Sequence, residues 1–180
     1  MQIITGKYKG RKLVSQPSFE TKPTLARVKE SLFCVIADEV EGKVVLDLFA
    51  GSGALGIECL SRGAKKVYFC DSSKDAIKYL KTNLRNINDG FEIVESDYYD
   101  ALMRLKTKFD LVFLDPPYDS DYGEKAVLLL SKMNMLNENA LIVFEHSSKK
   151  SLQSLPKNCI MEKSKVYGSV AIDFIRFRSV

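Results

Sequence analysis

Residues 44–56 read VVLDLFAGSGALG, and this pattern indicates the class of fold that the chain adopts. An apolar run that ends in an acid and continues into three glycines at GxGxxG spacing is typical of a buried parallel strand that turns sharply into a helix. Gly51 and Gly53 would let the backbone come close to a bound molecule, and Gly56 would let the helix pack tightly on its strand. We therefore predict a ligand site at this turn.

Asp47 changes which ligand the turn is expected to bind. The usual interpretation of GxGxxG is a cradle for the phosphates of a dinucleotide. An ionised carboxylate at the strand end, four residues before Gly51, would repel a pyrophosphate and attract an ammonium or sulfonium group. The predicted ligand therefore carries positive charge beside an adenosine-like body, which indicates S-adenosylmethionine rather than NAD.

Length and composition indicate one globular domain. The chain has 180 residues, of which 46% are hydrophobic and 28% charged, as is ordinary for a soluble protein with a single core. No apolar run approaches the roughly 20 residues of a membrane span, and the first residues do not resemble a secretory leader, so we expect a cytoplasmic protein. Four cysteines without CxxC spacing and one histidine predict reduced, mostly buried thiols and no metal site.

Positive charge is concentrated near the N-terminus. Residues 1–31 carry a net charge of +5 and the rest of the chain carries −1, for a total of +4. A basic arm on a near-neutral body is typical of nucleic-acid binding, because Lys and Arg gain affinity by releasing phosphate counterions. A merely soluble surface is the alternative. The predicted nucleic-acid contacts are Lys7, Lys9, Arg11, Lys12 and Arg27.

The pattern of elements predicts an α/β fold behind a small N-terminal extension, residues 1–40. The extension is expected to contain a β-hairpin of Gln2–Thr5 and Arg11–Ser15, and a helix from Leu25 to Asp38 with Thr24 as its N-cap. In the core, residues 41–180, strands and helices then alternate at intervals typical of βαβ units. Strands are expected at 43–49, 66–71, 91–95, 109–114, 139–145, 159–166 and 170–178, and helices at 54–63, 74–86, 98–106, 122–133 and 148–154.

This alternation predicts a mainly parallel seven-stranded sheet with helices on both faces and ligands at the carboxyl ends of its strands. Only three residues, 167–169, separate the last two strands, so these should form an antiparallel hairpin at one edge. Such a sheet is the Rossmann-like arrangement of class I methyltransferases rather than that of NAD-binding proteins.

Two acids follow the second and third strands of the core. Asp71 ends the strand at 66–71, twenty residues after Gly51, where an acid can accept hydrogen bonds from both ribose hydroxyls of a bound nucleoside. NAD enzymes use the same device, so Asp71 does not discriminate between the two ligands. Asp97 can accept from an adenine amino group, or cap the helix that begins at Tyr98, or do both.

The tetrapeptide Asp115-Pro116-Pro117-Tyr118 directly follows an apolar strand and carries the reaction chemistry. Two prolines fix a rigid bend and remove two backbone donors, which leaves a rim of carbonyl groups and one carboxylate that only accept. Such a rim suits the exocyclic amino group of a nucleobase, whose lone pair becomes nucleophilic when its N–H groups are held. Tyr118 adds an aromatic face on which a flipped base can stack. A proline turn with an incidental acid is the alternative.

Three further residues are weaker candidates. His146 follows the fifth core strand and is expected to be structural or to support the target pocket. Tyr8 and Tyr122 either stack on RNA or pack within the protein.

The sequence resembles the class I S-adenosylmethionine-dependent methyltransferases that act on amino groups, whose target motif is [DNS]-PP-[YFW]. More narrowly, it is similar to the bacterial 16S ribosomal RNA guanine-N2 methyltransferase family. The resemblance covers nearly the whole chain. It includes residues 3–13 (IITGKYKGRKL), 23–33 (PTLARVKESLF), 47–53 (DLFAGSG) and 115–118 (DPPY), of which the first two are the narrow signals.

The resemblance implies roles for individual residues. Asp115 to Tyr118 would be the catalytic residues at the target base, and residues 11, 23, 24 and 27 would belong to a motif that closes over the cofactor and contacts RNA. Lys22 departs from the Arg expected before Pro-Thr, which puts a bidentate phosphate contact there in doubt. The implied cofactor-binding residues are Asp47, Phe49, Gly51, Ser52, Gly53, Asp71, Ser72, Asp97 and Tyr98.

The resemblance also implies the reaction and its partners. Methyl transfer from S-adenosylmethionine to the N2 amino group of one guanine in 16S RNA would leave S-adenosylhomocysteine and need no metal. The substrate would be RNA within a small ribosomal subunit or an assembly intermediate, and the enzyme a monomer. The alternatives are a DNA adenine-N6 methyltransferase, which shares the Asp-Pro-Pro-Tyr logic, and an NAD-dependent or nucleotide-binding protein of the Rossmann type.

Overall fold

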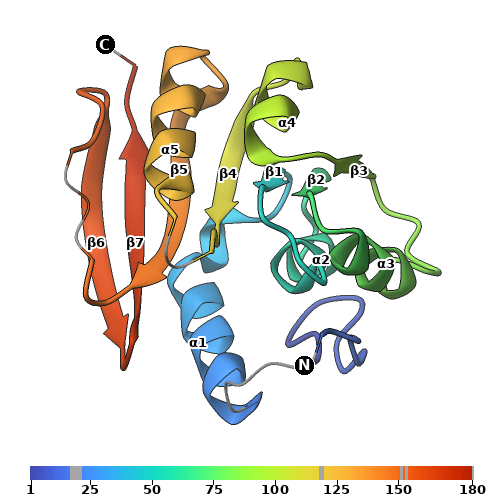
Figure 1. Ribbon diagram of the computed structural model, residues 1–180. Coiled ribbons are helices and arrows are strands. Elements are labelled where there is room, and N and C mark those ends of the chain that lie inside the picture. The colour runs from blue at the N-terminus through green and yellow to red at the C-terminus, as the bar shows by residue number, and fades with distance from the viewer. Residues whose placement is uncertain (17–21, 118–119, 151, 153, 180) are drawn as a thin grey trace.

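The protein is built around one seven-stranded sheet with the strand order β3-β2-β1-β4-β5-β7-β6 (Figure 1). The computed structural model describes residues 1–16, 22–117, 120–150, 152 and 154–179, with the backbone alone for residues 22–25. The strands are β1 (Val44–Asp47), β2 (Lys66–Asp71), β3 (Phe91–Glu95), β4 (Phe109–Leu114), β5 (Leu136–Ser147), β6 (Cys159–Tyr167) and β7 (Val170–Phe177).

Strand directions agree with the predicted fold class. Strands β1 to β5 pair in parallel, whereas β7 is antiparallel to both β5 and β6. The strand order reverses between β1 and β4, and in open α/β sheets ligands bind at such a point, outside the carboxyl ends of the strands. The sheet therefore places Asp47, the last residue of β1, beside the end of β4, where Asp115 follows.

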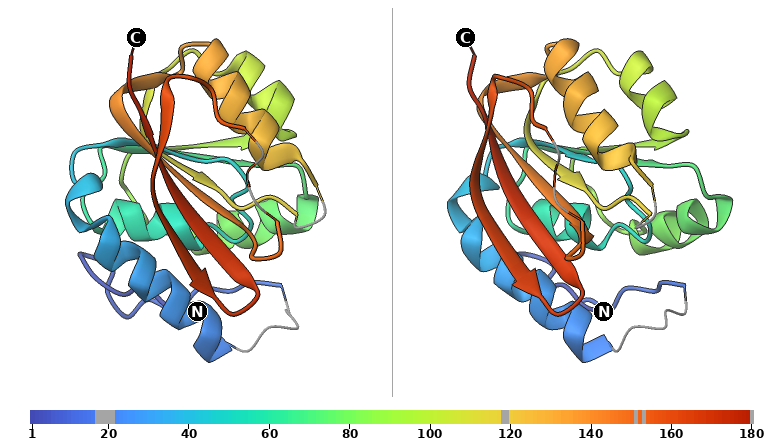
Figure 2. Two further views of the ribbon diagram at one scale, coloured as in Figure 1. Left: turned by 90° about the vertical axis from the view of Figure 1, so that its left-hand side faces the viewer. Right: turned by 60° about the vertical axis from the view of Figure 1, so that its left-hand side comes forward.

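Helices cover both faces of the sheet, and each face has its own apolar core (Figure 2). One core includes Phe33, Ile57 and Leu80, contributed by α1, α2 and α3, and the other includes Leu102 and Val127 from α4 and α5. The helices are α1 (Lys22–Val35), the 3₁₀ helix η1 (Ala37–Glu39), α2 (Ala54–Ser61), α3 (Lys74–Asn83), α4 (Tyr98–Arg104) and α5 (Tyr122–Lys132).

The N-terminal extension differs from its predicted form. Its two strands are reduced to a single antiparallel bridge between Gln2 and Lys12. A longer ladder does not form because the backbone N–H groups of Ile4 and Thr5 donate to the side chain of Glu58 on α2 instead of to a strand. Helix α1 begins three residues before the expected start, so Thr24 lies inside it, and it ends at Val35, where η1 follows.

The helix predicted at 148–154 is wrong. Residues 148 and 149 form a turn, and the described residues 150, 152 and 154 belong to no helix or strand. Strand β5 instead continues to Ser147, and the Ser148 N–H donates to the carbonyl of Ser169 in the β6–β7 turn at 2.8 Å. The apolar residues Leu152 and Leu155 pack against the core on the α4–α5 face without helical geometry.

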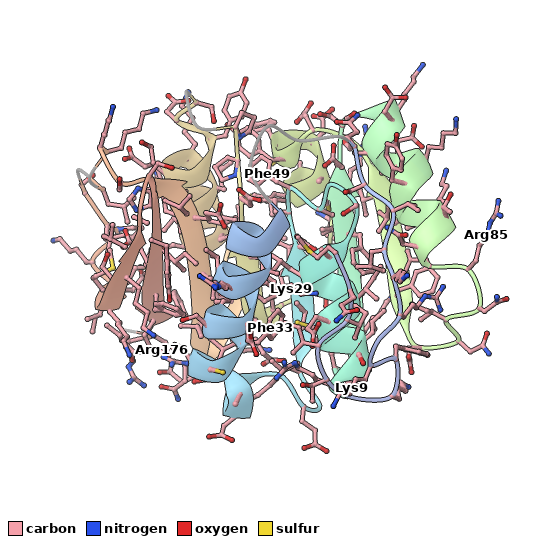
Figure 3. The ribbon with its side chains drawn as sticks, turned by 90° about the horizontal axis from the view of Figure 1, so that it is seen from below. Lys9, Lys29, Phe33, Phe49, Arg85 and Arg176 are labelled. Atoms are coloured by element: carbon pink, nitrogen blue, oxygen red, sulfur yellow. The ribbon has the colours of Figure 1, made fainter. Side chains whose placement is uncertain are left out.

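A buried charge network fastens the N-terminal extension to the sheet. Glu58 is fully buried and accepts from Ile4 N–H at 2.8 Å and Thr5 N–H at 3.0 Å. The Nζ of buried Lys29 on α1 lies 3.0 Å from Glu58 Oε2, and Arg62 Nε lies 2.9 Å from Oε1. Figure 3 looks onto this face and shows Lys29 between α1 and α2.

The network keeps Glu58 ionised. Burial alone would raise the pKa of this carboxyl, but the hydrogen bond from Ile4 and the cations of Lys29 and Arg62 together lower it below the ordinary value. A lowered pKa stabilises the folded state above the ordinary pKa, and this stability is lost as the pH falls through the lowered value. Protonation of Glu58 in acid is therefore expected to weaken the contacts that hold the extension.

The burial of the cysteines agrees in large part with the expectation from composition, and the helices bear on the expected absence of a membrane span. Cys59, Cys70 and Cys159 are buried, as expected for most of the thiols, whereas Cys34 is exposed on α1. Among the described residues, no helix has both the length and the apolarity needed to cross a bilayer.

We predict that Glu58→Gln destabilises the fold by roughly 3 kcal/mol, because it leaves Lys29 as a buried cation without its carboxylate. Chemical denaturation measures the loss, and hydrogen exchange should show faster exchange of the amides of Ile4 and Thr5. The control is Glu92→Gln, which breaks the exposed pair with Lys66 and should cost less than about 1 kcal/mol. Equal effects of the two substitutions would contradict the role of Glu58.

Candidate active site

A cavity of about 730 Å³ opens where the carboxyl ends of β1 and β4 meet α1 and the β6–β7 turn. This volume lies within the range of about 300–1,000 Å³ that is usual for small-molecule sites. Predicted site residues and residues with no predicted role share its wall. The lining consists of Met1, Ser15, Gln16, Val28, Lys29, Leu32, Asp47, Phe49, Ala50, Gly51, Ser52, Ala54, Leu55, Ala76, Tyr79, Asp115, Glu145, Tyr167, Gly168, Ser169 and Val170.

The glycine turn has the geometry that its sequence predicts. Gly53, the N-cap of α2, has φ of +82°, a left-handed conformation that residues with side chains rarely adopt. Gly56 has an ordinary φ, but a Cβ there would lie 2.2 Å from the ring of Phe69 on β2. The absence of a side chain at Gly56 therefore lets α2 pack directly on the sheet, as predicted.

Asp47 is buried in the wall of the cavity and is only 2% exposed. Its Oδ2 accepts from Gly56 N–H at 3.0 Å, which ties the end of β1 to the first turn of α2. Burial raises the pKa of Asp47 to about 7, a rise that the Gly56 hydrogen bond opposes and the nearby Asp71 carboxylate adds to. Near neutral pH this carboxyl therefore changes charge readily, and a cation in the cavity would favour its ionised form.

Asp71 organises the glycine turn from the neighbouring strand. Its Oδ2 accepts from Gly51 N–H at 2.8 Å, and its Oδ1 accepts from Ser73 N–H at 2.8 Å. Neither Asp71 nor the exposed Ser72 is among the residues that line the large cavity. The ribose contact of Asp71 therefore stays a prediction, and the structure adds a role for its carboxylate in fixing the turn.

An aromatic row runs outward from the cavity. Phe49 lines the cavity, its ring centroid lies 5.9 Å from that of Tyr98, and the Tyr98 centroid lies 5.0 Å from that of Tyr122. Tyr98 begins α4, and Asp97 caps this helix by accepting from Asp100 N–H at 2.9 Å. The capping alternative for Asp97 is thus confirmed, and its contact to adenine stays a prediction.

The Asp-Pro-Pro turn follows β4, the strand next to β1, so it leaves the sheet at the same edge as the glycine turn. Asp115 lines the large cavity, whereas Pro116 and Pro117 line a neighbouring cavity of about 110 Å³. The Pro117 carbonyl accepts from Ser120 N–H at 3.0 Å, which closes the bend after the two prolines. Tyr118 lies outside the described residues, so its predicted stacking role is not placed.

His146 is held in place beside the proline turn. Its Nε2 lies 2.8 Å from Oδ2 of buried Asp173 on β7, and its Nδ1 lies 2.9 Å from the Ser147 carbonyl oxygen. The ring lines the smaller cavity and contacts Phe144 at a centroid distance of 5.1 Å. His146 is therefore a structural residue that lines the smaller cavity together with Pro116 and Pro117.

The basic residues of the extension fall into two groups. Lys7 pairs with Asp89, and Nη2 of the half-buried Arg11 donates to the carbonyls of Asn83 and Arg85 at the end of α3. Lys9, Lys12 and Arg27 are exposed on the surface, and Figure 3 shows Lys9 on the N-terminal segment. Contacts of these five residues to RNA stay predictions, and Arg11 also fastens the extension to α3.

The sequence did not reveal several parts of the cavity wall. Val28, Lys29 and Leu32 face it from α1, and residues 167–170 close it from the β6–β7 turn. The motif at residues 23–33 contains the three α1 residues but does not show that they line the cavity, because this depends on the packing of the N-terminal helix with the C-terminal hairpin. Glu145 has no role predicted from the sequence either, although its place directly after the buried part of β5 is a usable signal.

A family model described as Conserved hypothetical protein 95 matches residues 1–176. Ribosomal RNA small subunit methyltransferase D of Haemophilus influenzae is 39% identical over 95% of this chain and 91% of its own length. The Escherichia coli protein of the same name is 35% identical over 95% of this chain and 87% of its own length. The chain therefore belongs to the Conserved hypothetical protein 95 family, and it is similar over most of its length to the ribosomal RNA small subunit methyltransferases D.

A structural relative agrees with this assignment. The solved structure named "Putative methyltransferase yhhF", from Escherichia coli, has a TM-score of 0.90 and 32% identity, and it covers 100% of this chain and 99% of its own. The resemblance inferred from the sequence is thereby confirmed, and so is the fold class, a mainly parallel class I methyltransferase sheet that ends in an antiparallel hairpin.

The raised pKa of Asp47 predicts a pH-dependent affinity for S-adenosylmethionine. Binding a cation favours the ionised carboxylate, so the affinity should rise about tenfold between pH 6 and 7.5, through the pKa of about 7. Asp47→Asn keeps an acceptor for Gly56 N–H and should remove most of this rise. Calorimetric titration at several pH values measures the affinity.

A pH-independent affinity of the wild-type protein would contradict the contact between Asp47 and the cationic part of the cofactor. S-adenosylhomocysteine, which lacks the positive sulfur, serves as the matched ligand. A smaller rise for this product than for S-adenosylmethionine would assign the contact to the sulfonium, and an equal rise would assign it to the amino acid ammonium.

Proposed function

We propose that the protein transfers a methyl group from S-adenosylmethionine to the N2 amino group of a guanine in 16S ribosomal RNA. The observation that carries this proposal is that one cavity is lined both by Asp115 of the proline turn and by Asp47 and Gly51 of the glycine turn. One turn would hold the methyl donor and the other the acceptor nitrogen. The names of the relatives support ribosomal RNA as the substrate.

Catalysis would rest on position and charge. Asp115 and the Pro116 carbonyl hold the two N2–H groups of guanine, so that the nitrogen lone pair points at the methyl carbon. The new N–C bond forms as the C–S bond breaks, the sulfur leaves as neutral S-adenosylhomocysteine, and the nitrogen becomes transiently cationic. Asp115 stabilises this positive charge, and Asp115 or solvent then takes the proton.

The cofactor would occupy the glycine-turn side of the cavity. Asp47 and Phe49 would face its methionine part, together with Gly51, Ser52 and Gly53. Asp71 and Ser72 would lie toward the ribose, and Asp97 and Tyr98 toward the adenine. The buried Asp47 and the aromatic contact between Phe49 and Tyr98 support this placement. This reaction needs no metal, because the electrophile is already activated by its positive sulfur.

RNA would approach over the N-terminal extension. The exposed side chains of Lys9, Lys12 and Arg27 would contact phosphates, as would Lys7 and Arg11. We propose one methyltransferase domain over residues 1–180, with residues 1–40 as an RNA-contacting extension, and the contacts of Glu58 with Ile4 and Thr5 support this single unit. So short a basic arm favours docking on a small subunit or an assembly intermediate, where ribosomal proteins complete the surface. We also propose that the enzyme is a cytoplasmic monomer.

Two rival functions make different predictions. A DNA adenine-N6 methyltransferase shares the Asp-Pro-Pro-Tyr motif and its way of holding an amino group. Residues 1–40, however, are too few to form a separate domain that recognises a duplex sequence. A dinucleotide-binding protein gives no reason for an acid at position 47, four residues before the first glycine, or for the proline pair after β4. Similarity to ribosomal RNA methyltransferases over most of both chains favours the proposed function over both rivals.

We expect Asp115→Ala to lower methyl transfer into small ribosomal subunits at least about 100-fold, because one group that stabilises the transition state is lost. Tritiated S-adenosylmethionine measures the transfer, and binding of S-adenosylhomocysteine should change by less than about threefold. The matched control is Asp38→Ala, an exposed acid in η1 at the amino-end side of the sheet, which should leave the rate unchanged.

Near-normal transfer by Asp115→Ala would refute the mechanism. Label that enters duplex DNA but not ribosomal subunits would establish the adenine alternative. Thermal stabilisation by NADH and not by S-adenosylhomocysteine would instead favour the dinucleotide-binding alternative.

A further inference from the structure

Glu145 brings a second carboxylate to the acceptor side of the cavity. It lies on β5, the strand next to β4, one residue after the pair formed by Leu114 and Phe144. Asp115 follows Leu114 in the same way, so the two acids come from corresponding places on neighbouring parallel strands. Both line the large cavity, and Glu145 also lines the smaller cavity behind the proline turn.

The position of Glu145 is rigid. Its backbone lies within the sheet and pairs with Ile172 on β7, a strand that is buried along almost its whole length. Glu145 is partly buried, whereas Asp115, the first residue after β4, is exposed. A carboxylate on a central strand is held more firmly than one on a loop and is better suited to recognition.

Guanine needs more than one acceptor along its Watson–Crick edge. Its N2 amino group and its N1–H are adjacent donors, so a carboxylate that holds only the amino group leaves N1–H without a partner. Adenine differs at this point, because its N1 is an acceptor beside the N6 amino group. A second carboxylate next to the amino-holding one would therefore accept from guanine and repel the corresponding edge of adenine.

Asp47 and Lys29, the other charged residues that line the cavity, lie elsewhere in its wall and have their own partners. Asp47 lies at the glycine turn, where it is buried and hydrogen-bonded to Gly56. Lys29 lies against α2, where its Nζ contacts Glu58 and the Gln2 carbonyl. Among the acids that line the cavity, Asp115 and Glu145 are the pair on the acceptor side.

We propose that Glu145 determines the specificity for guanine by accepting the N1–H of the target base while Asp115 holds its N2 amino group. This inference rests on the proposed function and adds a second contact to the same site. It assigns the choice between guanine and adenine to a residue outside the Asp-Pro-Pro-Tyr motif, which the two classes of methyltransferase share.

Replacing the target guanine with 2-aminopurine tests this contact, because 2-aminopurine keeps the N2 amino group and presents N1 as an acceptor. The nucleotide methylated by the wild-type protein is mapped first, and 16S RNA with either base at that position is assembled into small subunits. The wild type should prefer guanine in kcat/KM by roughly 10- to 100-fold, as expected for loss of one hydrogen bond to a charged group. In Glu145→Gln the preference should fall to within about threefold, because an amide can accept from guanine N1–H or donate to 2-aminopurine N1.

Glu41→Gln is the control, because Glu41 is an exposed acid before the amino end of β1 and should leave the preference unchanged. An unchanged preference in Glu145→Gln would overturn the inference, as would equal methylation of both bases by the wild type. A similar loss on both bases in Glu145→Gln would also overturn it, because the proposal requires the amide to retain part of the guanine reaction. If the wild type methylates no guanine in any small subunit, the proposed function fails instead.

Discussion

The hydrogen bond from Gly56 N–H to Asp47 is the contact on which the site depends. It joins the end of β1 to the start of α2 and so fixes the turn between them. Gly56 makes this possible because a Cβ there would collide with Phe69. The same close packing buries Asp47 and raises its pKa to about 7, so the geometry that forms the turn also leaves a carboxyl poised to ionise beside a cation.

A second constraint closes the cavity from segments distant in the sequence. Glu58 on α2 binds Ile4, Thr5 and Lys29, which draws the N-terminal segment and α1 against the sheet. Val28 and Leu32 on α1 then line the cavity together with the β6–β7 turn. The extension therefore contributes to the shape of the site itself, in addition to the RNA contacts that its positive charge predicts.

The sequence predicts those features that local patterns encode. Periodicity predicts the order of strands and helices. Residues that admit few conformations predict the glycine turn at Gly53 and Gly56 and the turn that places Asp115. Prediction from the sequence fails where contacts between distant segments determine the local structure. The predicted helix at 148–154 is absent from the described residues there, where the Ser148 N–H bonds to the β6–β7 turn, and the side chain of Glu58 takes the amides that a hairpin would have used. The role of α1 in the cavity also depends on such packing.

The central claim is that one cavity joins a methyl donor at the glycine turn to a guanine at the proline turn. Nucleoside mass spectrometry of ribosomal RNA from cells with and without the gene, before and after complementation, tests it most directly. The account predicts that one N2-methylguanosine disappears from the small-subunit RNA and returns with the wild-type gene but not with Asp115→Ala. An unchanged N2-methylguanosine content in the cells without the gene, or the loss of a methylated adenine instead, would contradict it.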